Sequence, residues 1–168
     1  MKIAIISDSH DNLENLKIFF DFAKKEKTDK IIHCGDLTDL QTLKYLASNF
    51  SGEVFLADGN VDVDFIEKDK VKKYANVKLV GKTGNLEFDS IKIGFCHYPE
   101  DAEKLAETGV FDHVFYGHTH KPWQEKRGKA ILSNPGTLAG MFYKATFAVL
   151  DTKTNKLELK ILEALNKF

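Results

Sequence analysis

The chain has 168 residues, of which 43% are hydrophobic and 29% charged, and its formal net charge is -1. This length and composition predict one globular domain over residues 1–168. Lysines are spread along the chain and Arg127 is the single arginine, so no basic stripe indicates nucleic-acid binding. No apolar run approaches the roughly 18 residues that a membrane helix needs, and no secretory leader pattern is present, so we expect a cytoplasmic protein.

Strands and helices are predicted to alternate in the first third of the chain. A helix is expected where apolar residues recur at helical spacing, and Asn12 supplies a cap for the first one. The predicted order is strand 2–6, helix 13–23, strand 30–33, helix 37–50 and strand 53–57. This order predicts a parallel sheet that is covered on both faces.

The pattern changes beyond residue 61. A polar stretch over residues 62–76 predicts a solvated helix or loop, and Asp89-Ser90 joins two β-rich runs in an expected hairpin. Pro99 opens a short predicted helix. The strands expected in this half are 85–88, 91–95, 113–116, 130–133, 145–150 and 157–162. We expect the last third to be mostly antiparallel.

Acidic, amide and imidazole side chains follow successive predicted strands. Asp8 and His10 follow the first strand, Asp36 the second and Asn60 the third. Because the carboxyl ends of parallel strands meet at one edge of a sheet, we expect these side chains to lie close together. Three later histidines would join them if the second half of the chain folds back onto this edge: His97, His118 and His120.

This set of side chains predicts a metal centre. Imidazole with carboxylate suits Mn, Fe, Zn, Co or Ni better than calcium, and seven ligands are too many for one tetrahedral ion. Two ions that share one carboxylate fit better, and Asp36, from the second strand, is the natural bridge. The spacing of His118 and His120 allows them either to share an ion or to divide between two.

Five sequence blocks stand in the order found in the calcineurin-like metallophosphoesterases, and the chain resembles that family over nearly its whole length. The blocks are Asp8-x-His10, Gly35-Asp36, Gly59-Asn60, His97 and Gly117-His118-x-His120. The short form, with Asn134-Pro135-Gly136 after the last histidines, is similar to small archaeal and bacterial phosphodiesterases related to vacuolar sorting protein 29. The resemblance implies an α/β fold with a two-sheet β-sandwich and helices on both outer sides.

The resemblance also implies a ligand set and an activity. One ion would take Asp8, His10 and His120, the other Asn60, His97 and His118, with Asp36 on both. The expected function is a two-metal phosphodiesterase in which a hydroxide between the ions attacks phosphorus, with Asp36 and Asn60 as the catalytic residues. We expect a small phosphate-ester substrate and favour manganese. The alternatives are a phosphomonoesterase, a non-enzymatic partner-binding module of this fold, or one structural metal. The sequence leaves the oligomeric state open, a dimer included.

The chain departs from many members of the family at Val61, where a histidine is common. That histidine is held to bind phosphate oxygen or to protonate the leaving group, so its absence argues against efficient monoester hydrolysis. Asp62 is either a support for the site or an exposed turn carboxylate. No arginine follows residues 134–137, so we expect no arginine to recognise the phosphate.

Several other conspicuous residues are expected to be structural. His33 and His113 are predicted to be packed or hydrogen-bonded, and Cys34 and Cys96 to be reduced, buried and not ligands. Trp123, Phe142 and Tyr143 could line a substrate or partner surface, but core packing is the expectation for them.

Overall fold

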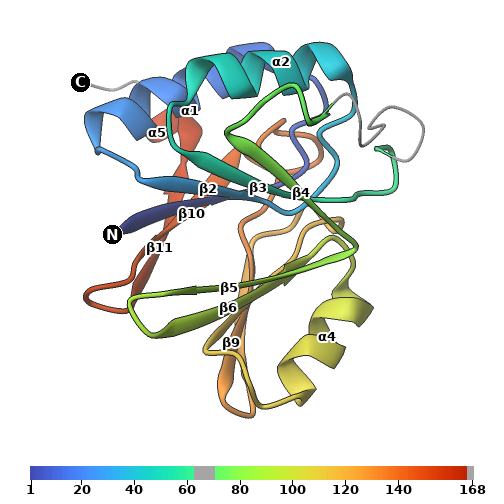
Figure 1. The fold of residues 1–168 in the computed structure, drawn as a ribbon, viewed down its shortest axis with the longest axis vertical. Helices are drawn as coiled ribbons and strands as arrows, with labels where there is room; N and C mark the ends of the chain where they lie inside the picture. The colour runs from blue at the N-terminus through green and yellow to red at the C-terminus, as the bar shows by residue number, and fades with distance from the viewer. Residues whose placement is uncertain (63–70, 166–168) are drawn as a thin grey trace.

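The computed structural model describes residues 1–62 and 71–165. Two β-sheets face each other, and helices cover the outer side of each (Figure 1). The predicted two-sheet sandwich with helices on both sides is therefore confirmed.

The first sheet contains the parallel strands that the sequence predicted. Its strand order is β11-β10-β1-β2-β3-β4. The four strands β1 to β4 run parallel, and β10 and β11 extend the sheet in antiparallel pairing from the other edge of β1. Their bounds are β1 Lys2–Ile6, β2 Lys30–His33, β3 Glu53–Ala57, β4 Val77–Gly81, β10 Thr146–Asp151 and β11 Lys156–Ile161.

The second sheet has the order β5-β6-β7-β9-β8. The predicted hairpin forms between β5 and β6, and β6, β7 and β9 run parallel to one another, while β8 pairs antiparallel with β9. The bounds are β5 Thr83–Phe88, β6 Ile91–Cys96, β7 His113–Phe115, β8 Trp123–Arg127 and β9 Ala130–Asn134. The last third of the chain is thus antiparallel except where β9 joins β7.

Helices α1 (Leu13–Lys25), α2 (Leu40–Asn49) and the short α5 (Leu162–Leu165) lie on the outer side of the first sheet, and α4 (Pro99–Glu107) lies on the second (Figure 1). The Asn12 side chain accepts a hydrogen bond from the Asn15 amide, which confirms the predicted cap of α1. Asp39 caps α2 in the same way. Each cap satisfies an amide that a helix start leaves without a partner.

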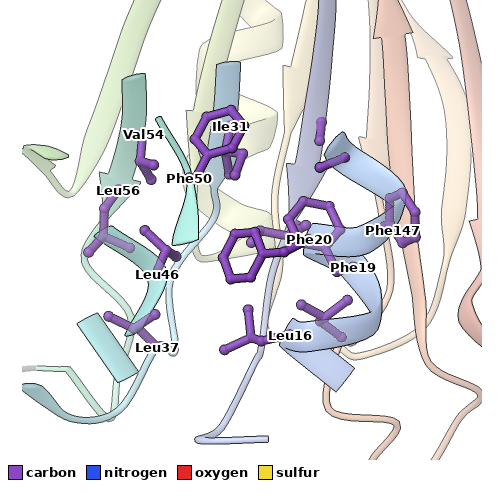
Figure 2. Packing of buried hydrophobic residues seen from close by; sticks show 14 of the residues in the cluster. Leu16, Phe19, Phe20, Ile31, Leu37, Leu46, Phe50, Val54, Leu56 and Phe147 are labelled. Atoms are coloured by element: carbon purple, nitrogen blue, oxygen red, sulfur yellow. The ribbon is translucent and has the colours of Figure 1, made fainter. Parts of the chain in front are cut away.

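The buried run of β1 explains how the layers are held together. Ile3 and Ile5 point into the core between the two sheets, while Ala4 and Ile6 point to the core beneath α1 and α2. Because alternate residues of a strand face opposite sides, one short strand contributes to both cores. Figure 2 shows the core under the helices, where Phe19 of α1 lies beside Phe147 of β10 and Phe20 lies on the side of α2.

The structure differs from the sequence-based expectation at β4, β8, α5 and the start of α2. β4 was not predicted, and β8 was not either, since its sequence is mostly polar and its position at a sheet edge leaves it largely exposed. α2 begins at Leu40 instead of Leu37, which is buried ahead of the helix. Most of the predicted solvated stretch, residues 63–70, lies outside the described residues.

In the described ranges no helix is long and apolar enough to cross a membrane.

Phe147→Ala should lower the free energy of unfolding by about 3–5 kcal/mol, because truncation of a large buried ring leaves a cavity. The Phe147 ring is fully buried and lies 5.1 Å from the Phe19 ring and 5.0 Å from the Phe22 ring. Urea denaturation measures the change. Leu159→Ala is the control, since its side chain is 49% exposed; a loss as large as that of Phe147→Ala would contradict the assignment of this core.

Candidate metal centre

The seven side chains singled out in the sequence come together at one end of the two sheets. Asp8, His10, Asp36 and Asn60 follow the adjacent parallel strands β1, β2 and β3, as predicted. The later histidines arrive on the second sheet, where His97 follows β6 and the segment from Gly117 to His120 follows β7. The Gly117 amide donates to the His97 carbonyl at 3.0 Å, so these two turns lie against each other.

Three of these side chains form a first group around Asp8. The Nε2 atoms of His10 and His120 are 3.2 Å apart, and His120 Nε2 lies 3.3 Å from Asp8 Oδ1. His10 Nε2 also lies 3.7 Å from Asp36 Oδ2. One atom from each of Asp8, His10 and His120 therefore faces a common point.

A second group forms on the other side of Asp36. His97 Nε2 is 2.9 Å and His118 Nδ1 is 3.0 Å from Asn60 Oδ1. His97 Nε2 lies 3.4 Å from Asp36 Oδ1. The two oxygens of Asp36 thus face different groups, with His10 beside Oδ2 and His97 beside Oδ1.

The donor chemistry of both groups fits divalent transition metals. Imidazole nitrogens and carboxylate or amide oxygens converge, and such mixed sets suit Mn, Fe, Co, Ni or Zn. Asp8 and Asp36 are buried, whereas Asn60 and His118 are exposed, so the centre has a carboxylate floor and one side open to solvent. A buried carboxylate is stable only when it is paired, which a cation would achieve here.

The backbone around the centre is unusual. Asp8, His10, Asp36, His118 and His120 all have positive φ, between 39° and 67°. Residues other than glycine rarely adopt this conformation, although Asp, Asn and His do so more often than most. Strained backbone of this kind gathers at functional sites, where the surrounding structure holds it in place.

Asp62 holds two of the turns together. It is buried, and its carboxylate accepts hydrogen bonds from the amides of Asp36 at 2.8 Å, Thr38 at 2.8 Å and Gly59 at 2.9 Å. Of the two roles considered for Asp62, the structure shows the supporting one. Gly59 is required at this contact, because a Cβ there would lie 2.2 Å from Asp36 Oδ1.

Asn134 supports the histidine turn, a role that the sequence reasoning missed. Its side-chain amide donates to the Gly117 carbonyl at 2.8 Å and contacts the Thr119 hydroxyl at 3.0 Å. The His118 amide in turn donates to both oxygens of Asp8, at 3.2 and 3.1 Å. A buried asparagine just before Pro135-Gly136 was the available signal, since such residues commonly fix turns.

Burial changes the protonation of the centre in the protein without metal. Burial, together with the nearby charge of Asp36, raises the pKa of Asp8 to about 7. Burial lowers the pKa of His97, and burial and the neighbouring His10 lower the pKa of His120. Neutral imidazoles are the form that binds metal, so lowered pKa values favour ligand character near neutral pH.

The other histidines and the cysteines are structural, as predicted. The His33 ring is fully buried, with Nε2 3.0 Å from the Ser9 hydroxyl and Nδ1 accepting from the Gly35 amide, and His113 Nε2 lies 2.7 Å from Asn155 Oδ1. Cys34 and Cys96 are free and buried, and burial raises the pKa of both thiols, that of Cys96 to about 12.

Core packing was the wrong expectation for the three remaining aromatic residues, and the expectation that no arginine recognises the phosphate stays a prediction. Trp123 is 50%, Phe142 87% and Tyr143 45% exposed, so none of the three is packed in the core. Their positions on an edge strand and on a connecting loop account for this. Arg127 forms ion pairs with Glu125 and Glu103 on the surface.

Asp62→Ala should weaken metal binding by about 10- to 100-fold, because the amides around Asp36 lose their shared acceptor and the bridging position loosens. Calorimetric titration with manganese measures the affinity. Asp39→Ala is a matched control, since it removes a carboxylate that accepts one amide at the start of α2. It should cost about 1 kcal/mol of stability and leave metal affinity unchanged; equal losses in both variants would contradict the supporting role of Asp62.

The metal-free protein should lose stability in mild acid through His33. Burial lowers the pKa of His33 from 6.5 to about 4, so the unfolded chain binds more protons than the folded chain between these values. The contribution is fully present above pH 6.5 and is lost, by up to about 3 kcal/mol, as the pH falls toward 4. His33→Asn, which keeps an acceptor for the Gly35 amide, should flatten the slope in urea unfolding. The raised pKa of Asp8 changes stability with pH in the opposite direction, so the slope of the variant is compared with that of the parent protein. Equal slopes in the two proteins would refute the role of His33.

Comparisons with known proteins agree with this geometry. A family model described as the calcineurin-like phosphoesterase superfamily domain matches residues 1–155. A phosphodiesterase of Methanocaldococcus jannaschii is 29% identical over 167 residues, which cover 97% of this chain and 100% of that protein. A solved structure described as a novel archaeal phosphodiesterase matches with a TM-score of 0.85 and 28% identity over 96% of this chain and 99% of that one.

More distant structures share the architecture. Vacuolar protein sorting 29 of Cryptosporidium parvum matches with a TM-score of 0.68 and 17% identity, over 95% of each chain, and shows likeness of fold alone. The family model spans most of the sequence and includes every residue of the centre described above. The chain therefore belongs to the calcineurin-like phosphoesterase superfamily and is a hydrolase of phosphoric esters.

Proposed function

We propose that this protein is a phosphodiesterase that uses two divalent transition-metal ions. The observation that carries the proposal is Asp36, whose two oxygens face different groups of nitrogen and oxygen donors. The likeness to a phosphodiesterase of Methanocaldococcus jannaschii supports the diesterase activity.

The residues divide into two ligand sets in this proposal. Asp8, His10 and His120 hold one ion, Asn60, His97 and His118 hold the other, and Asp36 serves both. His118 and His120, which are two residues apart in one turn, therefore belong to different sets. The contacts support this division, since His120 lies beside Asp8 and His118 lies beside Asn60. Manganese is the favoured ion, and the cytoplasm, where Cys34 and Cys96 would stay reduced, is the proposed compartment.

When bound, the ions supply a hydroxide near neutral pH for in-line attack on phosphorus and neutralise charge on the phosphoryl oxygens. The chain itself contributes position and polarity. Asn60 and His118 lie on the exposed side of the centre, where a small phosphate-ester substrate would enter. In this proposal the Asn60 side-chain amide donates to a phosphoryl oxygen as negative charge grows there.

Val61 favours diesters over monoesters in this proposal. Its backbone amide donates to Asp36 Oδ1 at 3.1 Å, so the residue stands at the centre, but its side chain has no proton to give. Protonation of a leaving group by a positioned acid is typically worth about 10²- to 10⁴-fold in rate. Substrates with good leaving groups depend on it least.

Asp36→Asn should abolish phosphodiester hydrolysis and lower metal content more than any other single ligand change, because Asp36 alone is proposed to serve both ions. Metal content is measured by plasma emission after gel filtration, and turnover with bis(p-nitrophenyl) phosphate across Mn, Ni, Co, Zn and Fe. Asp39→Asn is the control, as Asp39 caps α2 and is not one of the seven side chains of the centre. A variant at position 36 that keeps two ions per chain and near-normal turnover would refute the shared-carboxylate assignment.

Val61→His should raise kcat/KM for alkyl phosphomonoesters selectively, because an imidazole at this position supplies the missing acid. Turnover of aryl phosphodiesters should stay within a few-fold. Both substrate types are compared in both proteins at one manganese concentration. If the parent protein already prefers alkyl monoesters, another residue provides the proton and this interpretation of Val61 fails.

A further inference from the structure

The loop between β9 and β10 exposes three large apolar side chains in a row. Met141 is 42%, Phe142 87% and Tyr143 45% exposed. Single exposed apolar residues are common on protein surfaces, but consecutive ones are unfavourable for solubility and usually mark a binding site. The largest exposure belongs to the residue that lies at the metal centre.

Phe142 stands at the rim of that centre. Its ring lies 5.7 Å from the ring of His120, with an angle of 41° between the two planes. On the other side of the centre the Tyr98 ring lies 4.9 Å from His118 and 5.0 Å from His97. Phe142 therefore presents a nearly free aromatic ring directly beside a candidate ligand.

The loop is held in place from its base. The Leu138 amide donates to the Ser7 carbonyl at 2.9 Å and the Ala139 amide donates to the Asp8 carbonyl at 3.1 Å, so the loop starts on the turn that carries Asp8. Phe142 itself has a φ of 64°, a conformation that is costly for a residue with a bulky side chain. Strain and exposure at one residue have no benefit for folding, and both are typical of residues kept for function.

We propose that Phe142 is a stacking platform for a planar aromatic group, such as a nucleobase, in a phosphate ester whose phosphate occupies the metal centre. The proposal rests on the proposed function, because the phosphate must bind next to His120. A base has a flat face that stacks on an exposed aromatic ring whatever its hydrogen-bonding pattern, so one phenylalanine is sufficient for recognition. Phe142 would thus determine which esters bind, while the ligands carry out the hydrolysis.

Product affinity tests the platform without relying on turnover. AMP and ribose 5-phosphate carry the same phosphate and sugar and differ by the adenine base. Calorimetry with the manganese-loaded protein should show AMP binding roughly five- to hundredfold more tightly, the range expected for stacking of one base. Phe142→Ala should remove this preference and leave ribose 5-phosphate affinity within about twofold, and Phe142→Trp should keep the preference.

Tyr143→Ala is the matched control. Tyr143 is on the same loop, but it lines a separate hollow with Ile18 and Leu162, so its loss should leave the preference for AMP intact. Equal affinity for the two products in the parent protein, or a preference that survives Phe142→Ala, overturns the proposal. A change of molecular mass in sedimentation on Phe142→Ala, with the AMP preference unaltered, would assign the ring to a contact between copies and also overturns it.

The two proposals can fail separately. If the parent protein hydrolyses no phosphodiester with any of the metals, the proposed function is wrong. If it hydrolyses bis(p-nitrophenyl) phosphate but binds AMP no better than ribose 5-phosphate, only the role of Phe142 is wrong.

Discussion

Two carboxylates, those of Asp8 and Asp36, are buried at adjacent strand ends, and the arrangement of the centre follows from their burial. Asp8 and Asp36 lie at the floor of the centre, and in residues 1–62 and 71–165 their ion pairs are with histidines. Burial raises the pKa of Asp8 to about 7, because a buried carboxylate loses the hydration that stabilises its charge. Two bound cations would neutralise the buried carboxylates. The burial that is unfavourable for the charged carboxylates of the metal-free protein therefore favours metal binding.

The turns around the centre orient the two carboxylates. Left-handed backbone at Asp8 and Asp36 redirects each side chain from the end of its strand toward its neighbour. At Asp36 the turn is supported by the hydrogen bonds that Asp62 accepts from three amides. At Asp8 the carbonyl accepts from the Ala139 amide and the Thr137 hydroxyl. The centre is therefore supported by a second layer of polar contacts, which ligand positions require if they are to hold their geometry.

The two sheets, formed by different parts of the chain, supply different residues to the centre. The first sheet supplies both carboxylates and Asn60, and the second supplies three of the four histidines at the centre. The core between the sheets, with Ile5 on one side and Phe95 on the other, fixes their separation. In the proposed enzyme, the residues at the end of the two sheets carry out hydrolysis, and the loop that carries Phe142 selects among esters.

Sequence patterns were sufficient to predict the order of elements in the first half, the parallel sheet and the seven side chains of the candidate centre. This was possible because buried parallel strands are continuous apolar runs and polar residues at their ends stand out against them. Strands β4 and β8 escaped prediction, since neither edge position requires such a run.

The tertiary structure places His120 beside Asp8 and His118 beside Asn60, a division that the spacing of the two histidines left open and that the family resemblance implied. It alone also showed that Asp62 is buried under the turns and that Phe142 is exposed above His120. Local spacing determines which residues follow a strand together, whereas their partners come from chain segments far away in sequence. Those contacts exist only after the two sheets pack.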